Sequence, residues 1–312
     1  MERISTSTAY SGVLNNLMAA ENQQTTIGNQ ISSMQMATDL QGYASHAETL
    51  TALQTLQAQV TGYLNNATIT SNELTTQDTA LTQLGNAASS ASQAVNTAIA
   101  SGNGDTLMQQ LQAAFQNAVQ GLNSTSNGAY VFSGGNSNTA PVSINTLTAL
   151  VAAPSVASVF TNTQHVTTTQ FTANLSVQTG FLANQLGTPL FTAMQQIAAY
   201  DQGPNGPFGG TLTAAQQTFL EGEVAGLSSA GTGITAATAQ NGQAQSELTN
   251  SQTDLGNQQT TLQGLIGNIT NVDLAQASSQ LSQAQLAVQA SSRVFESLQS
   301  SSLMAVLTAS GH

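Results

Sequence analysis

Cysteine and lysine are absent from the 312 residues, and the basic side chains other than three histidines are two arginines. Without cysteine the chain has no disulfides, no thiolate metal sites and no cysteine nucleophile. A nucleic-acid-binding surface needs many cationic side chains to neutralise phosphates, and two arginines cannot supply them. Binding to an anionic membrane surface fails for the same reason. We therefore expect neither nucleic acid nor a lipid surface as a partner.

Charge of either sign is scarce. Charged residues make up 5% of the chain, against about 25% in an ordinary soluble domain, and the net charge is −12. No run approaches the roughly 20 apolar residues of a membrane-spanning helix, so no membrane insertion is expected. Ser, Thr, Asn and Gln must provide the polar surface, which is typical of secreted or surface proteins.

The start of the chain has neither the basic region nor the apolar segment of a secretory signal peptide. Taken alone, this predicts a cytoplasmic protein, whereas the composition favours an exported one. An export route that uses no cleaved signal peptide would reconcile the two observations.

The N-terminal part of the sequence has helical periodicity. Apolar residues at positions 13, 17, 20, 27, 31 and 34 follow the seam of a coiled-coil helix. A second register begins at Leu50 and predicts a helix to about Ile99. Gly102-Asn103-Gly104 then breaks the helix, and Asp105 is expected to cap a further helix that Asn127-Gly128 ends.

The middle of the chain favours β-structure. Residues 129–133 are typical of a short strand, and the β-branched residues between 166 and 177 favour another. We expect a small β-rich insert here.

Helical spacing returns in the C-terminal part. Pro189 is expected at a helix start, and a further helix is predicted over 212–227. Leucine and isoleucine then recur every seven residues from Leu248 to Ile269. A skip near 271–273 starts a new register with Leu274 and predicts two packing environments on either side of about residue 270.

These patterns predict a mainly α fold: a discontinuous core of long coiled-coil or bundled helices from both termini, with a small β-rich insert. We expect a terminal coiled-coil domain of 1–40 plus 270–312 and a helical core of 41–130 plus 185–269. Residues 131–184 are expected to form an outward insert.

No constellation of residues indicates catalysis. His46, His165 and His312 are scattered and lack metal-ligand spacing. Glu221 and Glu223 point to different faces of a predicted helix, and Asp201 in a Pro/Gly-rich loop is typical of a turn. We expect no catalytic, metal or cofactor site, and no enzyme.

The apolar seams are the strongest signal in the sequence. The same stripe serves an intramolecular core or a contact with neighbouring copies, and periodicity alone does not separate them. An antiparallel pairing with Tyr10 opposite about Met304 would bring Glu21 close to Arg293. Our candidates for subunit contacts are Val13, Leu17, Ile27, Ile31, Leu281, Val288, Phe295 and Leu298.

The C-terminal residues 271–277 and 281–291 resemble the C-terminal segment of flagellins and of the related hook–filament junction proteins. Residues 294–299 and 128–134 are more similar to the junction proteins than to filament flagellins. The resemblance covers about 1–140 and 187–307. Residues 32–40 depart from the family pattern because they contain no basic residue.

The resemblance implies a structural adaptor subunit that joins the bacterial flagellar hook to the filament. It implies export unfolded through the flagellar export apparatus, without a cleaved signal peptide, and an extracellular location on the flagellum. The implied partners are copies of the chain in a ring or tube, the hook-side junction protein, flagellin, and an export chaperone at the C-terminal helix.

Two other functions remain open at this stage. A filament-forming flagellin would share both ends of the sequence. A secreted adhesin or glycan-binding protein, from another class, would use the polar insert.

Overall fold

The computed structural model describes residues 2–309, with the side chains of residue 8 and of residues 10–300. Long helices dominate this part of the chain, and the strands form two small antiparallel two-stranded sheets, β1-β2 and β3-β4. The elements, in chain order, are α1 (Glu2–Ser33), η1 (Leu40–His46), α2 (Ala47–Ser101), α3 (Leu107–Leu122), β1 (Thr125–Ser126), β2 (Ala129–Tyr130), α4 (Leu147–Ala152), η2 (Val156–Val159), β3 (Thr168–Thr172), β4 (Leu175–Gln178), α5 (Ala183–Gln202), α6 (Ala214–Thr270) and α7 (Leu274–Ala309).

Contacts group the chain into two compact units. The first contains the residues up to Gln59 and those from Gln258, and the second runs from Val60 to Asn257. The three-part division expected from the sequence stays a prediction. Within the second unit, residues 131–184 share the apolar core with the helices, since Phe132 and Leu150 are fully buried there.

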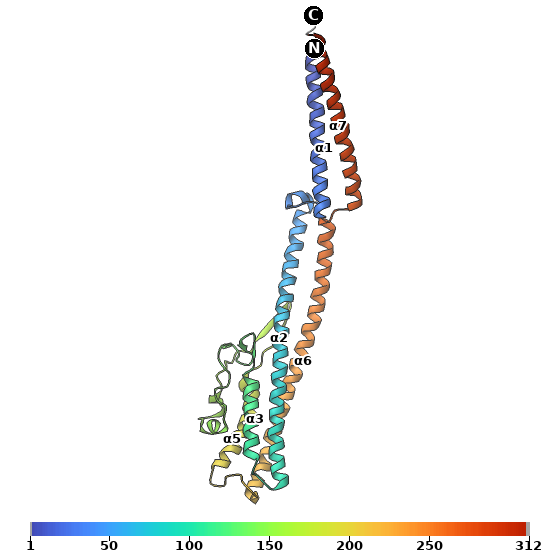
Figure 1. The fold of residues 1–312 in the computed structure, drawn as a ribbon. Helices are drawn as coiled ribbons and strands as arrows, with labels where there is room; N and C mark the ends of the chain where they lie inside the picture. The colour runs from blue at the N-terminus through green and yellow to red at the C-terminus, as the bar shows by residue number, and fades with distance from the viewer. Residues whose placement is uncertain (1, 310–312) are drawn as a thin grey trace. The chain divides into compact units, whose positions relative to one another are not determined.

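The core of the second unit is built around aromatic rings on α3 and α5. The ring of Phe191 lies 4.8 Å from that of Phe115 and 5.4 Å from that of Phe160, measured between centroids. Gly187 permits this packing, because a Cβ there would lie 2.8 Å from Leu122 and 2.9 Å from Phe160. α3, α5 and the neighbouring part of α2 lie together in Figure 1.

Amide side chains hold the irregular segment between β2 and α5 against the helices. Asn123 donates to the Val142 carbonyl and accepts from its N–H, at 3.0 and 2.9 Å. Gln112 accepts from the Leu147 N–H at 2.9 Å, and Gln195 donates to the Leu150 carbonyl at 2.8 Å. These hydrogen bonds satisfy backbone N–H and carbonyl groups that are not paired within a β-sheet. The many Asn and Gln side chains of the sequence thus have a structural role.

Several local predictions need correction. Asn127 and Gly128 have positive φ angles of 51° and 82° and form the turn between β1 and β2 rather than the end of a helix, as such turns require. Asp105 does not cap α3, because its carboxylate accepts from the Gly210 N–H at 2.5 Å. This bond, followed by one from Asn103, lowers the pKa of Asp105.

The remaining corrections concern element boundaries. The segment 166–177 forms two strands, β3 and β4, instead of one. Pro189 lies inside α5 and not at its start. The two helices expected over 212–269 are the single helix α6, which begins after a capping box in which Thr213 and Gln216 bond each other's backbone N–H groups.

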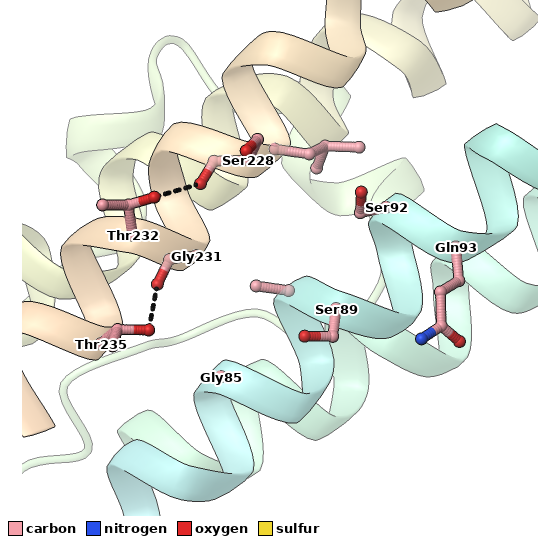
Figure 2. A pocket seen from close by; sticks show the side chains of 10 residues that line it. Gly85, Ser89, Ser92, Gln93, Ser228, Gly231, Thr232 and Thr235 are labelled. Atoms are coloured by element: carbon pink, nitrogen blue, oxygen red, sulfur yellow. Dashed lines mark hydrogen bonds between the residues drawn. The ribbon is translucent and has the colours of Figure 1, made fainter.

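α2 and α6 pack along a seam in the second unit that includes polar residues. Asn241 is fully buried and donates to the Leu74 carbonyl at 3.0 Å. Beside this layer lies a groove of about 470 Å³, lined by small residues such as Gly85, Ser89 and Gly231 (Figure 2). The hydroxyls of Thr232 and Thr235 there donate to carbonyls of their own helix at 3.0 Å.

Glu73 is a half-buried carboxylate on the flank of this seam. The Gln77 side-chain amide donates to the Glu73 carboxylate at 3.4 Å. Burial raises the pKa of the Glu73 carboxyl above its ordinary value of about 4.5, because leaving water disfavours the charged form.

Replacing Glu73 with glutamine is therefore expected to stabilise the protein at neutral pH. The pKa of Glu73 is higher in the folded protein than in the unfolded chain. The wild type therefore loses folding stability as the pH rises from the unfolded-state pKa through the folded-state pKa. The variant has no such loss. Its Tm should exceed that of the wild type by about 2 °C at pH 7 and by nothing at pH 4. Thermal unfolding at both pH values measures this, with the exposed Glu221→Gln as control; an equal difference at both would contradict it.

Candidate assembly interface

In the first unit α1 and α7 lie side by side (Figure 1) and run antiparallel. Neither helix contains proline or an internal break. α7 begins where the Asp273 carboxylate accepts from the N–H groups of Ala275 and Gln276, at 2.9 and 3.1 Å. This cap satisfies donors that a helix start leaves free.

Two backbone hydrogen bonds link the segment that follows α1 to the segment that precedes α7. The Met36 N–H donates to the Thr270 carbonyl at 2.8 Å, and the Val272 N–H donates to the Met34 carbonyl at 3.1 Å. These bonds join the segment after α1 to the segment between α6 and α7. The register skip expected near 271–273 is thus confirmed as a helix break, and the segment 32–40 supplies one side of the link.

Small and large apolar residues alternate across the contact between α1 and α7. Ile27 is buried against Ala277 and Ala284, with Ile31 and Leu281 packed on the cluster. The alanines allow the two helices to approach closely, as ridges-into-grooves packing requires.

The eight residues predicted as subunit contacts all lie on these two helices. Ile27 is buried, and the other seven are half-buried within the single chain: Val13, Leu17, Ile31, Leu281, Val288, Phe295 and Leu298. The structure thus uses at least Ile27, Ile31, Leu281 and Phe295 in contacts within the chain. Their contact with neighbouring copies stays a prediction.

The predicted pairing register is wrong. The Tyr10 ring packs against Phe295 with centroids 4.9 Å apart, so Tyr10 does not lie opposite Met304, whose side chain is outside the described residues. Nine residues correspond to about 13 Å along a helix. The shift moves Arg293 away from Glu21, and no ion pair between them is present in the described part of the chain.

A second apolar surface on these helices escaped the sequence analysis. On α1 it consists of Leu14 and Met18, which are 38% and 53% exposed. On α7 it includes Leu286 and Val294, 66% and 48% exposed. The spacing of four residues on α1 and of eight on α7 was visible in the sequence, but a seam and an outer stripe have the same periodicity. We call these four residues the outer stripe.

The described residues contain no group of three or more His, Asp or Glu that could hold a metal ion. His46 and His165 are exposed and far apart in the sequence, and His312 lies outside the described residues. The Asp201 carboxylate accepts from the Phe208 N–H at 2.7 Å, which is a turn-forming role. None of the described helices has the length and hydrophobicity of a membrane-spanning segment.

α7, together with α6 before it, matches a known protein family. Residues 224–307, which contain most of α6 and nearly all of α7, match the family model of the bacterial flagellin C-terminal helical region. The match thus covers the C-terminal part of the chain. No curated protein matches the chain significantly by sequence.

Solved structures match the chain in fold. A protein described as a flagellar hook-associated protein from Vibrio parahaemolyticus has a TM-score of 0.58 and 13% identity, with 72% of this chain and 97% of that one covered. The FlgL protein of Bacillus cereus has a TM-score of 0.53 and 15% identity, with 70% and 100% covered. These matches confirm the predicted fold class of long packed helices with small sheets.

Proposed function

We propose that this chain is a member of the flagellin family and a structural adaptor subunit that joins the bacterial flagellar hook to the filament. The observation that carries the proposal is the antiparallel pair of α1 and α7, which places a flagellin-type C-terminal region in a fold similar to that of hook-associated proteins. The chain acts by assembly and not by catalysis, and it needs no cofactor.

In this proposal the terminal helices, within 1–40 and 270–312, assemble with copies of the chain into a ring or tube. The seam between α1 and α7 holds each subunit together, and the outer stripe packs against neighbours. Such exposed apolar residues are typical of interaction surfaces. Further contacts are made with the hook-side junction protein on one side and flagellin on the other.

The subunit reaches the outside of the cell through the flagellar export apparatus, without a cleaved signal peptide. An export chaperone covers the C-terminal helix until then. The half-exposed apolar residues of α7, such as Leu274 and Val294 at 45% and 48%, support a need for such protection before assembly.

Deleting the gene tests the proposed function. We expect the deletion strain to build hooks and to release unattached flagellin into the medium, and the restored gene to bring back filaments and swimming. Electron microscopy of the cells and quantification of flagellin in the medium measure this. Normal filaments in the deletion strain would contradict the junction role and favour a filament flagellin.

A further inference from the structure

A small pocket in the second unit lies apart from the terminal helices. It has a volume of about 290 Å³, between Ile69 and Glu73 of α2, the β1–β2 turn with Tyr130, and the loop residues Ser137 and Thr167. Pockets for drug-sized ligands have about 300–1,000 Å³. The size therefore fits a single inserted side chain better than a larger ligand.

Glu73 is the one carboxylate among the residues that line this pocket, and Tyr130 is the other titratable group. A half-buried carboxylate is stabilised by a nearby cation, but the chain has no lysine, and its arginines, Arg3 and Arg293, belong to the other unit. The long bond from Gln77, at 3.4 Å, compensates the carboxylate poorly. The chain itself leaves this acid without a matching charge.

The rest of the pocket wall is rich in hydrogen-bond acceptors. Most threonine hydroxyls on the long helices donate to the carbonyl four residues earlier, as Thr75 and Thr76 do on α2. The hydroxyls of Ser126, Ser137 and Thr167 make no side-chain hydrogen bond with other described residues. A carboxylate, three hydroxyls and an aromatic ring together suit a planar cation with several N–H donors.

We propose that this pocket receives an arginine side chain presented by a partner protein. The guanidinium would pair with the Glu73 carboxylate, donate to the hydroxyls of the wall and lie near the Tyr130 ring, a favourable neighbour for a cation. The partner must supply the charge, because this acidic chain, with a net charge of −12, attracts more basic proteins. The inference is independent of which flagellar assembly the chain joins.

The test titrates the full-length protein with n-butylguanidinium at low salt and near-neutral pH, followed by the backbone amide NMR signals of Asn127 and Gly134. The Glu73 carboxyl signal of ¹³C-glutamate-labelled protein is recorded in parallel. We expect saturable shifts at the pocket, and a Glu73 signal that moves toward the ionised form. Affinity should fall at least about 10-fold in Glu73→Gln and stay unchanged in Glu221→Gln, an exposed glutamate of the same unit.

The comparison ligands decide what the pocket recognises. n-Butylurea has a shape similar to that of n-butylguanidinium but carries no charge. If n-butylurea binds at least about 10-fold more weakly than n-butylguanidinium, the result supports the proposal; equal affinity of the two ligands overturns it. Tighter binding of n-butylammonium would overturn arginine as the occupant. Displacement of n-butylguanidinium by stoichiometric Ca²⁺ would show a metal site and would also overturn the proposal. Unchanged affinity of the Glu73→Gln variant for n-butylguanidinium, with an intact amide spectrum, would overturn it too.

Discussion

Replacing Leu286 with glutamate is expected to stop the subunit from assembling while leaving its own fold intact. Leu286 is 66% exposed and lies on the face of α7 opposite the seam residues Ala284 and Val288, so the new carboxylate costs the monomer little. In an assembled interface the same carboxylate would be buried without a cation. Such burial costs several kcal/mol, which corresponds to a loss of more than about 100-fold in association.

Swimming, filament attachment seen by electron microscopy, and the Tm of the purified subunit measure the effect of Leu286→Glu. The matched control is Gln285→Glu, which adds the same charge at the neighbouring exposed position without removing an apolar contact. We expect filaments in the control and none in the Leu286 variant, with both subunits unfolding at the wild-type temperature. Normal attachment in the Leu286 variant would exclude the outer stripe of α7 from the assembly.

Replacing Phe191 with alanine is expected to give the largest loss of stability in the second unit. Phe191 is fully buried and contacts two other rings, those of Phe115 and Phe160. Removing a buried phenylalanine side chain costs about 3–5 kcal/mol, because the apolar contacts are lost and a cavity remains. For a unit of this size the Tm should fall by about 10 °C.

Thermal unfolding followed by circular dichroism measures the effect of Phe191→Ala. Leu175→Ala is the control, since Leu175 is an exposed apolar residue of the same unit and its truncation should change stability by no more than about 0.5 kcal/mol. Equal effects of the two substitutions would show that the ring cluster does not anchor this core.

The long helices were predictable because their apolar periodicity is a local property of the sequence. The spacing around Ile27 and Leu281 locates α1 and α7, and the skip at 271–273 locates the break between α6 and α7. The sequence-based predictions were wrong where a residue's hydrogen-bond partner lies far away in the sequence. Asp105 bonds Gly210 instead of capping α3, because that loop is brought beside it by the fold.

The subunit contacts stay a prediction, but the sequence placed their candidate residues on the two helices that pair in the first unit. The sequence correctly identified apolar residues of the terminal helices, but it did not distinguish the inward seam from the outer stripe. Both have helical periodicity, and the difference depends on which face the partner helix covers. The contact of Tyr10 with Phe295 fixes that face and the register, and no spacing within one helix contains this information.

The sequence by itself determined the class of this protein: no cysteine, no lysine and little charge excluded several kinds of partner, while helical periodicity and the C-terminal motif indicated the family. Those properties are compositional or local, so they can be read along the chain. Only the tertiary structure decided that residues 131–184 share the helical core, that Leu286 faces outward and that Glu73 lines a pocket without a cation of its own. These properties depend on contacts between residues far apart in the sequence, which packing alone establishes.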